Sequence, residues 1–197
     1  MFEIEKPVTT QADIKQAKQA LRKEIKMRKA DFFESYSSEE QVALSAQVLN
    51  RVEALPEFQR AKVVLAYYSL PDELYTHDAV ARWSKSKTIL LPKVVGDNLT
   101  LHRYCGVESM QKGAFGIMEP ATPQCCDYSS IDLVVVPGVA FDKDGNRLGR
   151  GRGYYDKLFA NLLPAKVAKV GVCYPFQIVD KVPAEDCDMQ MDNVLSI

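Results

Sequence analysis

The spacing of apolar residues predicts two helices at the start of the chain. Within residues 13–33, apolar side chains recur three or four positions apart and share one face, which is the period of a helix. A second segment with this period follows Ser37 and Glu40, whose spacing is that of a capping box. Pro56 is expected to mark the end of this second helix, because proline does not continue a helix.

The period then changes to short apolar runs that are typical of buried strands. Strands are predicted at residues 62–68, 88–91, 99–104, 131–136 and 167–173, and further helices at residues 76–84 and 154–163. Pro92 is expected to stop the second strand, and the alternating pattern of the third is typical of a sheet edge. Buried strands that alternate with helices indicate an α/β fold: a single-domain layered sandwich with a mainly parallel sheet flanked by helices.

The composition is that of a globular protein that does not depend on disulfides. The chain has 197 residues, of which 47% are hydrophobic and 26% charged, and this length suits one domain. We expect residues 1–10 to be an irregular lead-in and residues 11–197 to form the domain. The five cysteines include no CxxC pair, which indicates reduced thiols rather than a disulfide framework or a zinc site. With two histidines, a histidine-rich metal site or a Ser-His-Asp triad is poorly supported.

Charge and hydropathy restrict the partners. The formal net charge of −1 argues against a protein that coats nucleic acid. No apolar run approaches the roughly 18 residues that a membrane span needs, and no secretory signal is visible at the start of the sequence. We therefore expect a cytoplasmic protein with no nucleic-acid and no membrane partner. No obvious oligomerisation element is present, which favours a monomer.

A glycine- and arginine-rich segment at residues 136–156 carries the clearest chemical signal. It follows the most apolar strand and precedes a helix, at the place where open α/β sheets bind their ligands. Alternating glycines within residues 149–153 allow backbone N–H groups to approach phosphate oxygens, and nearby arginines add cations. The GxGxG spacing is neither the dinucleotide fingerprint nor a P-loop. A phosphate site and a flexible, solvated loop therefore both remain open.

Three further groups each have more than one interpretation. The first predicted helix is strongly basic and places Lys18 and Arg22 one turn apart, where both can reach one anion. It is equally a solvated face or a surface for RNA. Acidic side chains near the glycine-rich segment and the C-terminus can hold Mg²⁺ or lie in ordinary turns; they are Asp156, Asp186, Asp188 and Asp192. Residues 113–120 line a pocket or cap the core, while His77 is predicted at a helix surface and His102 on an edge strand.

Several segments together resemble the 5-formyltetrahydrofolate cyclo-ligase family, also called 5,10-methenyltetrahydrofolate synthetases. The most specific of them is VPGVAFDKDGNRLGRGRGYYDKLF, at residues 136–159. The others are Lys18-x-x-x-Arg22, residues 68–73 (YSLPDE), residues 113–120 (GAFGIMEP) and residues 188–192 (DMQMD), in the same order as in the family. The resemblance covers nearly the whole chain and implies an α/β sandwich.

The resemblance also implies an activity. Enzymes of this family use ATP and Mg²⁺ to convert 5-formyltetrahydrofolate to 5,10-methenyltetrahydrofolate, with release of ADP and phosphate. Phosphorylation of the formyl oxygen turns it into a leaving group, and N10 then attacks the activated carbon and closes the ring. Phosphoryl transfer needs positioning and charge neutralisation rather than a protein nucleophile, which agrees with a sequence that lacks a triad.

Individual roles follow from the same resemblance. ATP would be bound by Lys18, Arg22, Arg147, Leu148, Gly149, Arg150, Gly151, Arg152, Gly153, Tyr154 and Tyr155. The folate would be bound by Tyr68, Glu73, Arg150, Gly151, Arg152, Gly153 and Tyr154. Arg150, Arg152 and Tyr154 would act in catalysis, and Asp156 and Asp188 would hold the metal. Relatives often have lysine where this chain has Arg152, and either side chain supplies a cation.

Two other functions remain open from the residues alone. A phosphosugar- or CoA-type enzyme on a similar fold would also need a phosphate-binding loop. A nucleotide- or RNA-binding module would use the basic helix and would show steep salt dependence without ATP turnover. ATP dependence and saturation by folate distinguish the cyclo-ligase from both.

Overall fold

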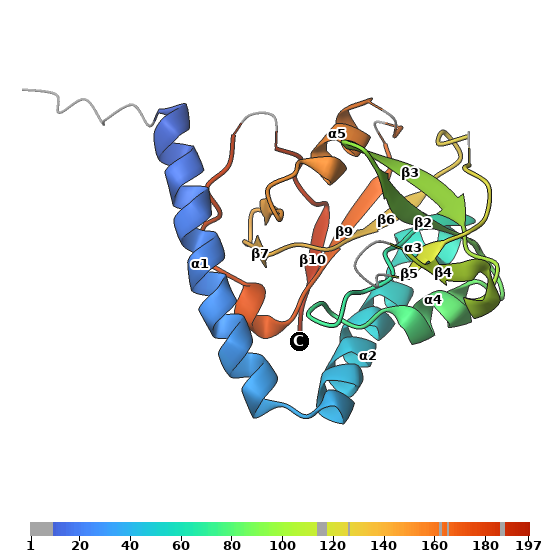
Figure 1. Cartoon of the computed structure of the whole chain (residues 1–197), viewed down its shortest axis with the longest axis horizontal. Coiled ribbons are helices and arrows are strands. Elements are labelled where there is room, and N and C mark those ends of the chain that lie inside the picture. The colour runs from blue at the N-terminus through green and yellow to red at the C-terminus, as the bar shows by residue number, and fades with distance from the viewer. Residues whose placement is uncertain (1–9, 114–117, 126, 162, 165, 186–187) are drawn as a thin grey trace, which may run out of the picture.

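The computed structural model describes residues 10–113, 118–125, 127–161, 163–164, 166–185 and 188–197 (Figure 1). The α-helices are α1 (Gln11–Ser35), α2 (Ser38–Ala54), α3 (Pro56–Arg60), α4 (His77–Trp83) and α5 (Tyr154–Asn161), with 3-10 turns η1 (Val107–Ser109) and η3 (Pro175–Gln177). The strands of the main sheet, in spatial order, are β10 (Asn193–Leu195), β9 (Ala168–Val172), β6 (Leu133–Val136), β1 (Val63–Leu65), β2 (Thr88–Val95) and β3 (Asn98–Arg103). Two short antiparallel pairs lie outside it: β4 (Met110–Lys112) with β5 (Met118–Pro120), and β7 (Ala140–Phe141) with β8 (Arg147–Leu148).

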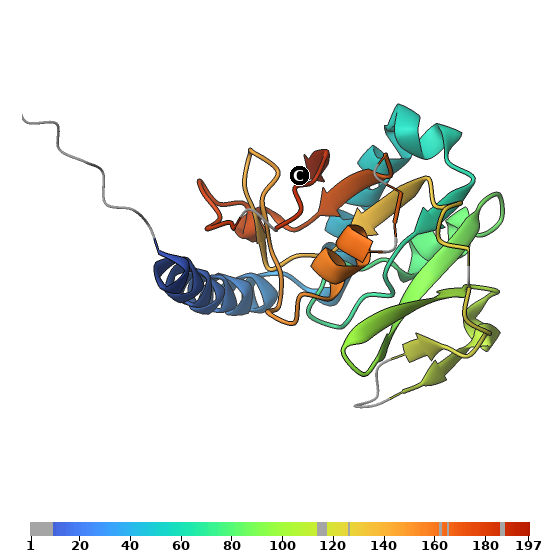
Figure 2. The same cartoon turned by 90° about the horizontal axis from the view of Figure 1, so that it is seen from above.

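The main sheet is parallel from β10 to β2, and only its edge strand β3 runs antiparallel. Alternate residues of each strand face opposite sides, so Val64 packs with α2, α3 and α4 while its neighbour Leu65 packs with α5. Figures 1 and 2 show these helices on the two faces of the sheet. The predicted α/β architecture, with a mainly parallel sheet between helices, is confirmed. Within the described ranges, no helix combines the length and the apolar character needed to cross a bilayer.

The two N-terminal helices start at side-chain caps. Ser37 Oγ accepts from Glu40 N at 3.3 Å, and the Glu40 carboxylate accepts from Ser37 N at 2.8 Å, so the predicted capping box is confirmed. Thr10 and Asp13 form a second capping box at the start of α1. The prediction for Pro56 is confirmed: α2 ends at Ala54 with Leu55 as its cap, and Pro56 begins the separate helix α3, where its fixed φ suits a helix start.

The prediction that Pro92 stops a strand is wrong, because β2 continues through it to Val95. Hydrogen bonds explain this. Ile89 O accepts from Tyr104 N on the β3 side, whereas Leu90 O accepts from Ala66 N on the β1 side. Strand alternation therefore turns the nitrogen of Pro92 toward the β1 side, beyond Leu65 where β1 ends. A missing N–H breaks no ladder bond there.

Helix α1 lies along one side of the molecule, next to the segment that follows β9 (Figure 1). Ile25 and Phe32 are its buried residues, and the Phe32 ring contacts Phe176 of η3 with centroids 5.0 Å apart. The Phe141 ring packs closely against the segment after β6 and against β9 itself. A Cβ on Gly138 or on Gly171 would lie 2.5 or 2.6 Å from its ring, so glycine is needed at both positions.

The turn between β7 and β8 is organised by a buried carboxylate. Asp142 is 1% exposed and accepts from Asp144 N at 3.0 Å, Asn146 N at 2.9 Å and Val182 N at 2.8 Å. The bond from Val182 ties this turn to the C-terminal segment. Burial raises the pKa of Asp142, but the hydrogen bonds from Val182 and Asn146 outweigh burial and hold the pKa below its usual 3.8.

We expect Asp142→Asn to lower the free energy of unfolding by about 1–3 kcal/mol at neutral pH, because an amide cannot accept all these hydrogen bonds. Since the folded-state pKa lies below 3.8, the stabilisation is complete above pH 3.8 and is lost as the pH falls toward the folded-state pKa. Urea denaturation at neutral pH and near pH 3 should therefore show the two proteins converging in acid. A stability difference that is the same at both pH values would contradict this account.

Candidate active site

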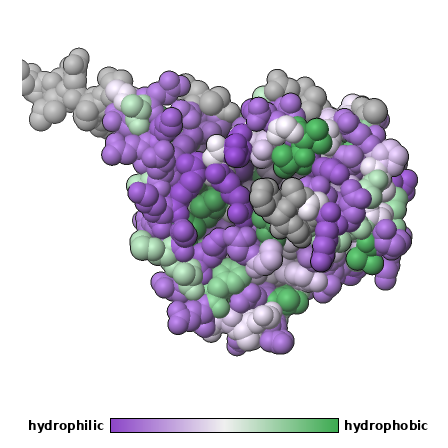
Figure 3. Space-filling view, in the orientation of Figure 1, coloured by the Kyte–Doolittle hydropathy of each residue, from purple (hydrophilic) through white to green (hydrophobic). Residues whose placement is uncertain are grey.

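The carboxyl ends of three parallel strands border a cavity of about 290 Å³ beside α1. Its walls are Tyr67 and residues 72–74 after β1, residues 137–139 after β6, and Val172 at the end of β9, together with one face of α1. Open α/β sheets bind ligands at this edge. The face of the molecule in Figure 3 is hydrophilic along α1, with smaller hydrophobic patches set among the polar residues.

Helix α1 presents Lys18, Arg22, Ile25 and Lys29 at steps of four, three and four, which puts them on one face. Ile25 is 2% exposed and anchors this face to the protein. Arg22 Nε donates to Gly149 O at 2.9 Å, so the basic helix directly contacts the glycine-rich loop. Arg22 therefore lies against the glycine-rich loop, and contact of Lys18 and Arg22 with phosphate stays a prediction.

Lys18 is paired with acidic residues of the C-terminal segment. Its Nζ lies 2.6 Å from Asp188 Oδ2 and 2.8 Å from Glu185 Oε2. Burial disfavours the charge of Lys18, but the hydrogen bonds to Asp188 and Glu185 outweigh it and raise the pKa of the amine above its usual value. Lys18, expected to bind phosphate, and Asp188, expected to bind metal, are thus direct neighbours.

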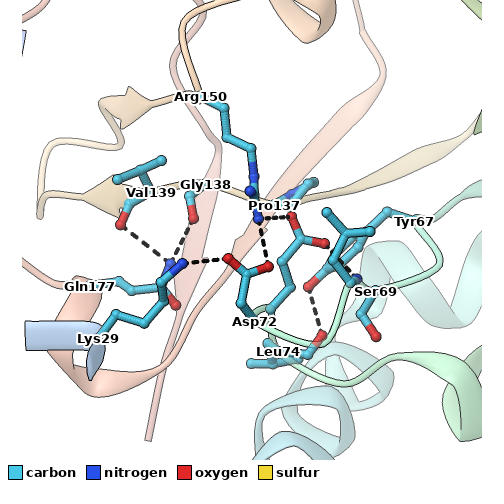
Figure 4. A network of polar contacts seen from close by, with 12 residues as sticks. Lys29, Tyr67, Ser69, Asp72, Leu74, Pro137, Gly138, Val139, Arg150 and Gln177 are labelled. Atoms are coloured by element: carbon cyan, nitrogen blue, oxygen red, sulfur yellow. Dashed lines mark hydrogen bonds and ion pairs between the residues drawn. The ribbon is translucent and has the colours of Figure 1, made fainter. Parts of the chain in front are cut away.

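The glycine-rich loop brings Arg150 across to the segment after β1. Arg150 Nη2 lies 2.9 Å from Glu73 Oε1 and 3.1 Å from Asp72 Oδ1 (Figure 4). Gly151 and Gly153 have φ of +101° and +67°, a backbone region that glycine adopts without strain. The loop therefore turns sharply between Arg150 and the start of α5 at Tyr154, with Gly151 and Arg152 exposed.

Arg147 lies beneath this loop rather than at its surface. Its side chain is 5% exposed, and Nη2 donates to Asp156 Oδ1 at 2.9 Å. The guanidinium also lies over the Tyr155 ring, 5.5 Å from its centre. Leu148 is buried in the core between α1 and the C-terminal segment. The Arg147–Asp156 ion pair joins β8 to α5 and so anchors both ends of the glycine-rich loop.

The structure thus brings only part of the predicted ATP and folate set to the cavity. Arg22, Glu73 and Arg150 line it. The side chains of Tyr68, Arg147, Leu148, Arg152, Tyr154 and Tyr155 are not among those that line its described part. For this second group, contact with a ligand stays a prediction.

Tyr68 and His77 form a stack near the end of β1. Their ring centroids are 3.6 Å apart with a 12° angle between planes, and Tyr104 lies 6.4 Å beyond Tyr68. His77 is half-buried, and its Nε2 contacts Ser69 O at 2.9 Å. Burial lowers its pKa, so the ring is neutral at neutral pH. The prediction of a plain helix-surface histidine is wrong, because the chain folds back to pack it on Tyr68.

The remaining candidates divide into those the structure places and those outside the described residues. His102 lies on the edge strand β3 as predicted and contacts Thr122 O at 2.6 Å. Asp186 and residues 114–117 lie outside the described residues. No cluster of three or more His, Cys, Asp or Glu side chains suited to a metal occurs in the described part of the chain.

Several residues that line the cavity were missed from the sequence, among them Lys29, Asp72 and Gln177. Lys29 Nζ lies 2.5 Å from Asp72 Oδ2, and Gln177 Nε2 donates to Gly138 O at 2.6 Å (Figure 4). Lys29 continues the face that holds Lys18 and Arg22, and this periodicity was a usable signal. For Gln177 there was none, because its role depends on the contact between η3 and the segment after β6.

Comparison with known proteins gives a consistent result. The protein-family model of the 5-formyltetrahydrofolate cyclo-ligase family matches residues 14–196. The chain is 29% identical over 186 residues to 5-formyltetrahydrofolate cyclo-ligase of Haemophilus influenzae, covering 91% of this chain and 97% of that protein. It is 28% identical over 195 residues to the protein of the same name from Mus musculus, covering 92% and 94%.

The fold is similar to that of a solved relative. The NMR structure of Aquifex aeolicus 5,10-methenyltetrahydrofolate synthetase superposes with a TM-score of 0.77 and is 36% identical in sequence. The match covers 91% of this chain and 89% of that one. The family match includes α1 and all the segments that line the cavity.

We expect Asp156→Ala to lower the free energy of unfolding by about 3 kcal/mol, because it leaves the buried Arg147 guanidinium without its carboxylate. Removing one partner of a buried ion pair usually costs about 3–5 kcal/mol, and we expect the low end of this range because Asp156 is 29% exposed. Urea denaturation provides the measurement, with Asp144→Ala in the exposed β7–β8 turn as the control. A loss below about 0.5 kcal/mol, the usual effect of a surface substitution, would show that this pair does not anchor the loop.

Proposed function

This chain is an enzyme of the 5-formyltetrahydrofolate cyclo-ligase family, and we propose that it converts 5-formyltetrahydrofolate to 5,10-methenyltetrahydrofolate. The proposed reaction uses ATP and Mg²⁺ and releases ADP and phosphate. The observation that carries it is the position of Arg150. The glycine-rich loop holds this cation against Asp72 and Glu73 at the carboxyl edge of the sheet, where the two substrates would meet.

The ATP end of the site is built from cations and backbone N–H groups. Lys18 and Arg22 project from α1, and Gly149–Gly153 supply N–H groups at the start of α5. Acidic side chains and a carbonyl group partner these cations in the structure, and the phosphates would replace them. This use of α1 favours a small anionic ligand at the cavity over RNA on an open surface.

The folate end is formed by the segment after β1. Glu73 Oε2 accepts from Leu70 N at 3.0 Å, which orients the carboxylate toward the cavity. A carboxylate is a suitable acceptor for the N–H donors on the pyrimidine edge of a pterin. The Tyr68 ring, backed by His77, would supply a flat surface for the folate.

The proposed chemistry follows from this arrangement. The formyl oxygen attacks the γ-phosphorus as the bond to the ADP oxygen breaks, which gives a phosphorylated formyl group. N10 then forms a bond to the activated carbon, phosphate departs with the C–O electron pair, and N10 loses its proton. Arg150 and Arg152 neutralise the charge on the transferred group, and exclusion of water protects the activated intermediate.

Asp188 and Asp156 suit magnesium as oxygen donors. The described hydrogen bonds use Oδ2 of Asp188 and Oδ1 of Asp156, and the second oxygen of each carboxylate is a hard ligand of the kind that Mg²⁺ prefers. With nucleotide phosphates and water, one or both carboxylates would complete the coordination. When bound, the ion neutralises charge on the phosphate oxygens.

The direct test is to mix the protein with 5-formyltetrahydrofolate, ATP and Mg²⁺ and to follow the near-ultraviolet absorbance of the methenyl product. We expect the band to appear only when both ATP and Mg²⁺ are present. A folded protein that binds ATP and forms no such product would overturn the proposed function and would point to another phosphate-using enzyme.

We expect Arg150→Ala to lower kcat by about 100- to 1,000-fold, as loss of one charge-stabilising donor does in other enzymes. Because the Arg150 side chain is 52% exposed, the melting temperature should stay close to that of the wild type. Lys143→Ala, which removes an exposed cation from the β7–β8 turn, is the matched control. If Arg150→Ala lost stability and activity in parallel, its role would be structural.

A further inference from the structure

Asp72 lies between two cations that come from distant parts of the chain. Its Oδ2 contacts Lys29 Nζ of α1, and its Oδ1 contacts Arg150 Nη2 of the glycine-rich loop at 3.1 Å. Each oxygen therefore serves one partner, so both contacts are made at the same time. Figure 4 shows the side chains of Lys29 and Arg150 meeting at Asp72 from different directions.

Glu73 cannot hold Arg150 in this way throughout the reaction. Arg150 Nη2 contacts Glu73 and Asp72 together, but Glu73 is also the acceptor proposed for the folate. Once Glu73 Oε1 accepts a hydrogen bond from a substrate N–H, the ion pair between Glu73 and Arg150 weakens. Asp72 has no such competing role and is the acid that remains for Arg150.

Lys29 provides Asp72 with a fixed partner. It lies between Ile25 and Phe32, the two buried residues of α1, so its backbone belongs to the best anchored part of the helix. Its side chain is 30% exposed, and that of Asp72 is 40% exposed. Burial raises the pKa of Asp72, but Lys29 and Arg150 outweigh burial and lower the pKa below its usual 3.8, so the carboxylate stays charged at neutral pH.

We propose that Lys29 and Asp72 form a positioning pair that holds Arg150 over the cavity while Glu73 binds the substrate. The inference rests on the proposed function for the role of Glu73, and on the structure alone for the contacts. Neither residue touches the reacting atoms in this account. Both act through the guanidinium of Arg150, whose placement decides how well charge on the transferred phosphate is neutralised.

The test combines steady-state kinetics with hydrogen exchange of the loop amides at residues 149–153. The variants are Lys29→Ala, Asp72→Ala and the double variant, with Lys29→Arg as the conservative change. Lys23→Ala removes an exposed cation from the same helix and is the matched control. Exchange is measured without ATP or folate, so it reports the loop itself.

In both Lys29→Ala and Asp72→Ala, hydrogen exchange of the loop amides should become about fivefold faster. This is the size of effect expected when a partly exposed ion pair is lost. We expect kcat to fall by at least the same factor, with less change in the KM for ATP. Because Lys29 acts only through Asp72, adding Lys29→Ala to Asp72→Ala should have no further effect. Lys29→Arg should restore most of the loss, and Lys23→Ala should behave like the wild type.

Two results would overturn the inference. One is additive loss of kcat in the double variant, which would mean that Lys29 acts independently of Asp72. The other is loop exchange that is unchanged in both single variants. If the wild-type protein formed no methenyl product, the proposed function would fail, and the exchange comparison would still decide whether the pair holds the loop.

Discussion

Parallel pairing of the strands is the constraint on which the rest of the molecule depends. In the stretch from β10 to β2, parallel strands place their carboxyl ends at the same edge. The segments that leave this edge must therefore converge, although they lie far apart in the sequence. Asp72 and Glu73 follow β1, Gly138 follows β6, and Gln177 follows β9, yet all four line one cavity.

A second wall is needed to turn this edge into an enclosed site, and α1 provides it. The helix docks through Ile25 and Phe32 and turns its cations inward, toward acids and a loop carbonyl. The ion pairs Lys18–Asp188 and Lys29–Asp72–Arg150 hold the site together. The Lys18–Asp188 pair is partly exposed and therefore weak, so an anionic substrate can replace it at low cost, whereas the proposed Lys29–Asp72 pair stays in place.

The rigid part of the site is buried, and the adjustable part is exposed. The Arg147–Asp156 pair lies beneath the glycine-rich loop and fixes where it begins and ends. Arg150 and Arg152, above it, are exposed and can follow a substrate. The proposed phosphoryl transfer needs cations that are close but adjustable, and this loop combines both properties.

The sequence by itself determined the fold class, most helices and the glycine- and arginine-rich segment, because periodicity and capping are local properties that tertiary contacts reinforced. It failed at Pro92, where the direction of the missing N–H decides whether proline interrupts a strand. Only the tertiary structure paired Asp72 with Lys29 and buried Arg147 against Asp156. A charged residue looks the same in a sequence whether it faces water or a partner 43 residues away, as Lys29 does, and long-range packing alone makes that choice.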